Sequence, residues 1–343
     1  MKFDKQAIRH RALELISTNK DHGVGARLAS EFGLSRQVAN GYLQSLIRDG
    51  LIEAEGSTRA RIYRLKMLLA LDHSFLREGL QEDVVWREHF APAVADLPEN
   101  VRDIWHFAVT EMINNAIDHS GSPEVRVGLQ KNALFTEAWV ADNGEGIFLK
   151  IQRELKLFDP REAILELAKG KLTTAPQNHS GEGIFFTSRL VDAFDIQSGR
   201  LHFQHDRRAF DMLTERPADA PGTLVMMRLV HDSPRSMQSV FDEFSDEEDY
   251  SFDKTVVPIR LAQHEGEKLV SRSQAKRVAH RFERFKRVVL DFDGVAEIGQ
   301  AFADELFRVF PAEHPNVRLT PINTSTAVAN MVRRALGAGE KSM

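Results

Sequence analysis

The chain contains no cysteine, and this absence excludes several kinds of site. Without cysteine there is no disulfide and no thiolate ligand for a metal. The 13 histidines are not paired at the close spacings that metal ligands require. These absences predict a protein of a reducing, cytoplasmic compartment.

Long apolar runs are also missing. The first ten residues, MKFDKQAIRH, carry charges where a secretion signal needs an apolar core, and no apolar stretch approaches the length that crosses a bilayer. We therefore expect a soluble protein without membrane contact. With 343 residues, 42% of them hydrophobic, the chain is long enough for two or three domains.

The net charge of −5 is distributed unevenly. Residues 1–70 hold 12 lysines and arginines against 7 acidic residues, a net charge of +5, which leaves −10 for the remainder. A basic N-terminal segment joined to an acidic remainder predicts that only the first part meets a polyanion. The acidic stretch FDEFSDEEDY, residues 241–250, lacks periodicity and is interpreted as part of an exposed linker over residues 233–253.

Residues 1–68 show the signals of a helix-turn-helix. Apolar spacing predicts helices over residues 4–18 and 26–32, and Ser35 is the expected N-cap of a third helix. The stretch LIEAEGSTRARIYRL then alternates as a two-stranded hairpin does. The third helix is expected to bury Val38, Tyr42, Leu43, Leu46 and Ile47.

These features resemble the winged helix-turn-helix domains of bacterial transcription regulators. The resemblance implies DNA binding, with phosphates reached by arginines of the hairpin and base edges met by polar residues of the third helix. The residues it assigns to DNA contact are Ser35, Arg36, Gln37, Asn40, Gln44, Arg59, Arg61 and Arg64. The alternative is a winged helix that binds only protein.

The segment EMINNAIDHS, residues 111–120, places polar side chains in the apolar wall of a long helix. Glu111, Asn114, Asn115 and Asp118 fall at i, i+3, i+4 and i+7, so they share one face. A carboxylate and two amides on such a helix need partners. Either the stripe faces solvent, or it faces a ligand that supplies charge and hydrogen bonds.

Two glycine motifs follow this helix. A predicted strand, LFTEAWVAD, runs directly into DNGEGI, residues 142–147, and HSGEGIFF opens a further helix at residues 181–183. Backbone amides at such a helix start can receive phosphate oxygens. Gly222 and Thr223 then lie on a late strand. Each motif alone is common, but their order and spacing together are improbable by chance.

This set of motifs resembles the Bergerat or GHKL ATP-binding domain, which is shared by gyrase B, Hsp90-type chaperones, histidine kinases, MutL and the anti-sigma-factor kinases. The resemblance covers residues 72–232 and implies ATP and Mg²⁺ as cofactors. It assigns Asn115 as the Mg²⁺ ligand, Glu111 as general base and Asp142 as acceptor of the adenine amino hydrogen. The other nucleotide contacts that it implies are Asp118, Gly144, Gly146, Ile147, Gly181, Glu182, Gly183, Ile184 and Thr223.

Residues 148–180 have the length of a mobile lid over such a site. Gly170 and Pro176 predict breaks around a short helix within it. No P-loop lysine is present, so Lys169 and Lys171 are the candidate phosphate contacts.

Residues 254–343 alternate between predicted strands and helices. The stretch VVLDFDGVAEIGQAFADELF resembles the core of STAS-like domains found behind such ATPase modules in bacteria. Anti-sigma-factor antagonists of that fold carry a phosphorylatable serine where this chain has residues 297–300, EIGQ, so no phospho-acceptor role is expected here. Asp291 and Asp293 are expected to cap the strand end or face solvent.

These patterns predict an α+β multidomain protein: a winged helix-turn-helix, a Bergerat α/β sandwich with helices on one face of a mixed sheet, and a small STAS-like α/β domain. The favoured function is an ATP-binding and DNA-binding regulator whose conformation, protein partner or homodimer contacts change with Mg-ATP. The alternatives are a serine/threonine protein kinase of anti-sigma-factor type and an ATPase whose winged helix binds protein. A histidine kinase is disfavoured, because His106 and His119 are expected to serve helix packing.

Overall fold

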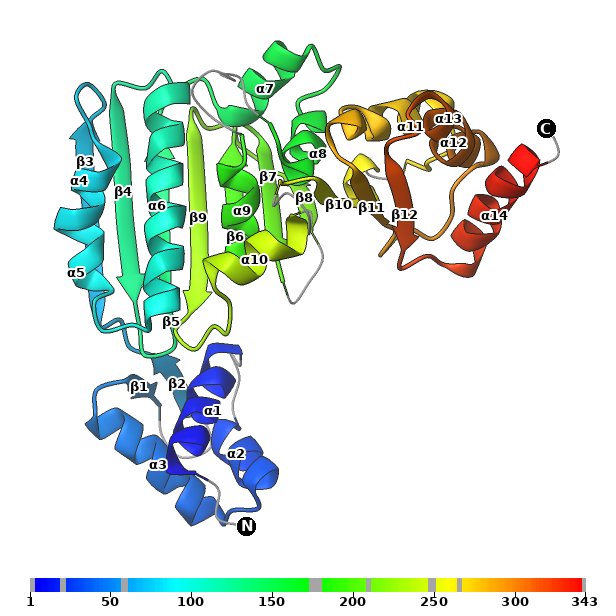
Figure 1. Ribbon diagram of the computed structural model, residues 1–343. Helices are drawn as coiled ribbons and strands as arrows, with labels where there is room; N and C mark the ends of the chain where they lie inside the picture. Colours follow the sequence, from blue (N-terminus) through cyan, green and yellow to red (C-terminus); the bar gives the residue numbers. More distant parts are fainter. Residues whose placement is uncertain are drawn as a thin grey trace.

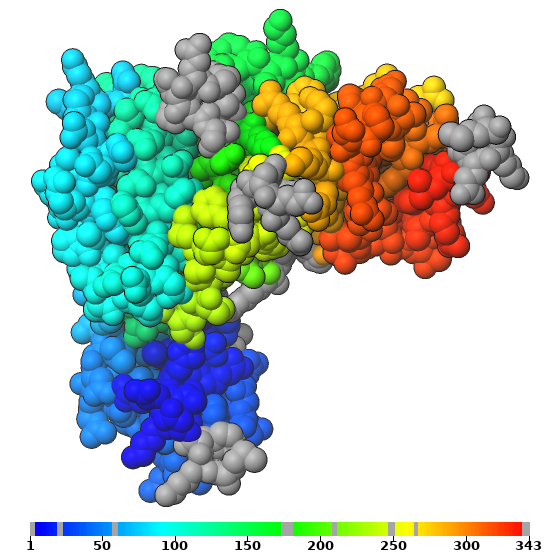
Figure 2. Space-filling view, in the orientation of Figure 1, coloured from blue at the N-terminus to red at the C-terminus, as the bar shows by residue number. Residues whose placement is uncertain are grey.

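The computed structural model describes residues 4–18, 23–56, 61–172, 181–207, 211–245, 251–263 and 267–340. The chain forms three successive parts: an N-terminal helical part, a large sheet covered by helices, and a small C-terminal α/β part (Figure 1). In the space-filling view the first and last parts project from different sides of the central one (Figure 2). Within these described ranges, every helix is too short or too polar to cross a bilayer.

The N-terminal part consists of three helices and a hairpin. These are α1 (Lys5–Thr18), α2 (Val24–Phe32), α3 (Arg36–Arg48), β1 (Ile52–Glu55) and β2 (Ile62–Leu65). The predicted N-cap is confirmed, because the Ser35 side chain accepts a hydrogen bond from the Val38 amide. The expected burial of Val38 is wrong, since it is 46% exposed and the buried stripe of α3 begins at Ala39 instead.

Seven antiparallel strands form the central sheet, in the order β3-β4-β5-β9-β6-β7-β8. Their bounds are β3 (Leu69–Leu76), β4 (Glu124–Lys131), β5 (Phe135–Asp142), β6 (Ala193–Ser198), β7 (Leu201–Asp206), β8 (Met212–Glu215) and β9 (Thr223–Val230). The prediction of a mixed sheet is therefore wrong for the described strands. Short connections such as the one between β4 and β5 can join only antiparallel neighbours.

Helices cover one face of this sheet (Figure 1). They are α4 (Glu82–Val85), a π-helical turn (Trp86–Phe90), α5 (Ala91–Ala93), α6 (Glu99–His119), α9 (Gly183–Leu190) and α10 (Met237–Phe244). The apolar residues of α6 are buried against the sheet, which is why its polar stripe is confined to another face. The lid region contains two helices, α7 (Ile147–Leu155) and α8 (Glu162–Lys169), where one was expected. Gly170 ends α8, and Pro176 lies outside the described residues.

The stretch interpreted as an acidic linker is partly helical and packed. Helix α10 occupies residues 237–244 and buries Val240 and Phe244. The Phe241 ring packs on the Phe186 ring with 4.1 Å between centroids. The interpretation as an exposed linker is wrong for this segment because its aromatic residues recur at helical spacing, which the acidic composition obscured. Residues 246–250 lie outside the described part of the chain.

The C-terminal part contains a parallel sheet in the order β10-β11-β12. Its elements are β10 (Lys254–Pro258), a 3₁₀ turn (Ile259–Ala262), α11 (Arg272–Ala279), a 3₁₀ turn (Phe282–Arg284), β11 (Arg287–Asp291), α12 (Gln300–Asp304), a π-helical turn (Glu305–Val309), α13 (Phe310–Glu313), β12 (Arg318–Ile322) and α14 (Thr326–Glu340). The predicted alternation of strands and helices is confirmed. Asp291 caps the strand end as expected, since it accepts hydrogen bonds from the Asp293 amide and the Asn323 side chain.

Candidate functional site

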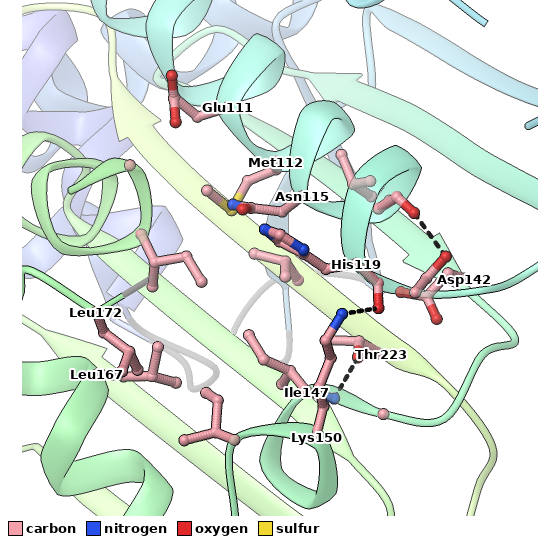
Figure 3. Close-up of a pocket in the computed structure, with 18 of the residues that line it drawn as sticks. Glu111, Met112, Asn115, His119, Asp142, Ile147, Lys150, Leu167, Leu172 and Thr223 are labelled. Carbon is pink, nitrogen blue, oxygen red and sulfur yellow. Dashed lines mark hydrogen bonds between the residues drawn. The ribbon is translucent and has the colours of Figure 1, made fainter. Parts of the chain in front are cut away.

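The described residues surround a cavity of about 300 Å³ between α6, the end of β5, the start of α9 and helices α7 and α8. This volume suits a small ligand. Figure 3 shows Glu111, Asn115 and His119 along α6, with Leu167 and Leu172 on the other side of the cavity. The predicted site residues that line it are Glu111, Asn115, Asp142, Gly146, Ile147, Gly181, Gly183, Ile184 and Thr223.

Three predicted contacts do not line the cavity within the described part of the chain. Asp118 is exposed near the end of α6, and Glu182 is half-buried beside the glycine motif. Gly144 packs against the backbone of Ser120, whose carbonyl oxygen a side chain at this position would overlap. Helical spacing placed Asp118 on the correct side of α6, but the cavity wall there is formed by His119.

Asn115 leaves a buried polar group without a partner. It lies one turn after Glu111 on α6, and its side-chain nitrogen has no hydrogen-bond partner among the described residues. A buried amide group left unpaired costs about 1–3 kcal/mol. A ligand atom that accepts a hydrogen bond from this nitrogen would remove that cost, and the side-chain oxygen of the same amide could then ligate a cation.

The end of β5 and the start of β9 form the opposite end of the site. Asp142 pairs with Thr223 across the sheet, and the Thr223 hydroxyl accepts a hydrogen bond of 3.0 Å from the Ile147 amide. The Asp142 carboxylate accepts a bond of 2.8 Å from the Gly144 amide. Burial raises the pKa of Asp142, and the backbone amides of Gly144 and Thr223 oppose that shift. Its hydrogen bonds hold this carboxylate in a fixed orientation at the cavity wall.

Two glycines allow backbone segments to approach the cavity closely. Gly146 has φ of +92°, and a side chain there would lie 2.6 Å from the Ser198 hydroxyl. Gly183 opens α9, and its missing side chain leaves the space occupied by the Glu111 carboxylate. Glycine is therefore favoured at Gly146 by conformation, and a larger residue at Gly183 would displace the Glu111 carboxylate.

The lysine assignments made from the sequence are wrong in this structure. Lys169 is fully buried and its ammonium lies 2.7 Å from Glu166, while Lys171 pairs with Asp253 at 2.9 Å. Neither lines the cavity in the described chain, whereas Lys150 does and donates a 2.9 Å bond to the His119 carbonyl. The register of α7 could have indicated this, because Lys150 lies one helical turn after Gly146.

Further cavity residues carry no motif that could have identified them. They are Met112, Ala116, His119, Ser120, Val140, Ile151, Leu167, Leu172, Phe185 and Val225. Most of them are apolar, and the sequence alone gives no reason to distinguish them from ordinary core residues. His119, which was expected to serve helix packing, also lines the cavity.

The predicted DNA-contacting residues differ in exposure between α3 and the hairpin. Arg36, Gln37, Asn40 and Gln44 are all exposed on α3, and Ser35 is exposed as its cap. On the hairpin, Arg64 is exposed and lies 3.5 Å from Glu55, whereas Arg61 is half-buried. Arg59 lies outside the described residues. The exposed helix face is thus available to a partner.

Comparison with known protein families identifies two segments. Residues 82–202 match the histidine kinase-like ATPase domain, and residues 274–329 match the STAS-like domain of unknown function (DUF4325). No curated protein matches the chain. The first match spans α6, both glycine motifs and most of the cavity lining. The chain therefore contains a histidine kinase-like ATPase domain and, after it, a STAS-like domain.

Proposed function

We propose that the protein is an ATP-binding and DNA-binding regulator, in which Mg-ATP in the cavity changes conformation or partner contacts. The observation that carries this proposal is the convergence of Glu111, Asn115, Asp142 and the second glycine motif on one cavity. The match of residues 82–202 to an ATPase domain supports ATP as the ligand.

The two ends of the cavity suit the two ends of ATP. Asp142, held by the Gly144 amide and beside Thr223, would accept the adenine amino hydrogen. The Asn115 side-chain oxygen would ligate Mg²⁺, which would neutralise phosphate charge, while the side-chain nitrogen, unpaired among the described residues, would donate to a ligand oxygen. The backbone amides of Gly183 and the residues after it would be offered to phosphate oxygens at the start of α9.

Replacing Glu111 by glutamine tests the role of the general base. We expect ATP turnover to fall by about 10²–10⁴-fold, because glutamine cannot accept a proton from the attacking group. ATP affinity should change little, since the shape of the side chain is kept. Phosphate release and calorimetry measure the two quantities, and unchanged turnover would show that Glu111 only positions other groups.

Replacing Gly183 by alanine should weaken ATP binding by roughly 10–100-fold, the effect of about 1–3 kcal/mol of overpacking. The new methyl group would overlap the Glu111 carboxylate at the cavity wall. The fold should survive, because alanine favours the helix that begins there. Calorimetric titration with ATP measures the change. Gly41→Ala is the matched control, since a side chain at Gly41 meets no atom within 4 Å.

DNA binding is proposed from the N-terminal part. Three helices followed by a hairpin have the element order of a winged helix, and α3 exposes Arg36, Gln37, Asn40 and Gln44. The net charge of +5 over residues 1–70 adds attraction to a polyanion. The test is a gel shift at several salt concentrations, with and without ATP. DNA affinity that is the same with and without ATP would contradict regulation of DNA binding by ATP. A protein that binds ATP but not DNA would favour a winged helix that binds protein.

Replacing Arg36 by alanine should weaken DNA binding by about tenfold, since one base or phosphate contact contributes about 1–3 kcal/mol. Arg333→Ala is the control, because Arg333 is exposed on α14 in another part of the molecule and its loss changes net charge equally. Equal effects of the two substitutions would assign the loss to net charge and contradict a contact by α3.

A serine/threonine protein kinase is the second candidate, supported by Glu111 at the cavity wall. Residues 297–300 of the STAS-like domain contain no serine, so the acceptor would be a separate protein. Transfer of radiolabel from ATP to a protein partner would favour this activity over a purely conformational role.

A further inference from the structure

Helix α8 lies beside the C-terminal part (Figure 1), and it also contributes to the wall of the cavity. All its residues from Ala163 to Lys169 are buried. Leu167 lines the cavity, whereas Glu166 and Lys169 contact the C-terminal part. One short helix thus forms a wall of the proposed ATP site and an interface with the following domain.

A buried carboxylate joins α8 to the C-terminal part. Glu166 lies 2.7 Å from Lys169, 3.1 Å from the His280 ring and 3.0 Å from the Arg281 guanidinium. The side chains of Glu166 and Arg281 are only 3% and 4% exposed. Lys169 also donates to the His280 carbonyl at 2.8 Å. The network therefore includes groups from both sides of the interface.

The pKa shifts agree with one carboxylate shared by several cations. Burial alone would raise the pKa of Glu166, but Lys169, His280 and Arg281 outweigh it and lower the pKa to about 2. Burial lowers the pKa of Lys169, and its attraction to Glu166 is partly offset by repulsion from Arg281. The carboxylate is thus the group on which the neighbouring cations depend.

The residues after α8 are held by the same domain. Thr255 on β10 donates a 2.7 Å bond to the Lys169 carbonyl, and Arg281 donates to the carbonyls of Gly170 and Lys171. Lys171 pairs with Asp253 at 2.9 Å. These bonds fix the backbone at the end of α8, where a lid would have to bend.

The next residue returns the chain to the cavity. Leu172 lines the cavity, and its amide donates a 3.0 Å bond to the carbonyl of Gly181 in the second glycine motif. Between Lys169 and Leu172 there are only two residues. Movement of the C-terminal domain relative to α8 would therefore displace Leu172 in the cavity wall.

We propose that the STAS-like domain is an intramolecular clamp on the ATP site, which acts through α8 and slows nucleotide exchange while it is docked. The inference rests on the proposed function for its ligand. Breaking only part of a buried charge network would leave an uncompensated charge, which is costly. We therefore expect the contacts between α8 and the C-terminal domain to be lost all at once. Any signal that undocks the domain would release nucleotide.

Charge reversal at the rim of this interface tests the clamp. Arg277 lies 3.1 Å from Glu162 at the start of α8, and neither residue lines the cavity in the described chain. We expect Arg277→Glu to speed hydrogen exchange of residues 163–172 without nucleotide, and to speed dissociation of a fluorescent ATP analogue, each by about tenfold. The double variant Glu162→Arg with Arg277→Glu should return both rates to within about threefold of the parent.

Lys268→Glu is the control, because Lys268 pairs with Glu297 on the C-terminal domain and both side chains are exposed. Glu166→Gln is the stronger variant and should exceed the effect of Arg277→Glu. If the ATP analogue dissociates at the parent rate from both Arg277→Glu and Glu166→Gln, the clamp is overturned, while the proposed ATP site is not contradicted. Faster hydrogen exchange with unchanged dissociation also overturns it. A parent protein that binds no ATP instead overturns the proposed function, and the nucleotide role of the clamp with it.

Discussion

Replacing Asn115 by alanine should weaken binding of Mg-ATP by about 100-fold, because the interactions of a buried amide with a charged ligand contribute about 1.5–3 kcal/mol. Asn115 and Trp105 both have a buried side-chain nitrogen on α6 without a partner among the described residues, but only Asn115 of the two lines the cavity, where a ligand can reach its amide. Mg²⁺ keeps most of its ligands as phosphate oxygens and water, and one protein oxygen is sufficient to orient it. Loss of that oxygen should remove the dependence of ATP affinity on Mg²⁺.

Calorimetric titration with ATP, with and without Mg²⁺, measures the ATP affinity and so tests this prediction. Asn114→Ala is the matched control, because Asn114 is the preceding residue of α6, is also half-buried and does not line the cavity among the described residues. It should leave affinity within about threefold of the parent. Equal behaviour of the two variants would place the metal site elsewhere.

Replacing Glu166 by alanine should lower the free energy of unfolding by about 3–5 kcal/mol, the cost of leaving buried cations without their carboxylate. Glu166 is almost completely buried and contacts Lys169, His280 and Arg281. Its effect should therefore be much larger than that of a surface ion pair. Urea unfolding of parent and variant gives the difference, and Glu297→Ala, which removes an exposed carboxylate of the same domain, should cause no detectable change.

The effect of Glu166 should depend on pH. Its pKa is lowered from 4.5 to about 2 in the folded protein, so its stabilising contribution is complete above the unfolded pKa and is lost as the pH falls towards 2. The difference in stability between the parent and Glu166→Gln should accordingly shrink between pH 4.5 and pH 2. A difference that stays constant over this range would contradict an ionised Glu166 in the folded state.

Features that depend on neighbours in sequence were predictable. The stripe of Glu111 and Asn115 follows from helical spacing, and the Ser35 cap follows from local hydrogen bonding. The two glycine motifs were recognisable because each needs only a few consecutive residues. Their order along the chain led to the ATPase resemblance, which the match of residues 82–202 supports.

Features that depend on contacts between distant residues were decided only by the tertiary structure. Lys169 and Lys171 have the charge of phosphate contacts, yet they pair with Glu166 and Asp253, while Lys150 lines the cavity. The sequence by itself determined the polar stripe of α6, the Ser35 cap and the order of the motifs, because periodicity and capping act over a few residues. Only folding decided which charges meet, since the groups that surround Glu166 come from segments more than 100 residues apart.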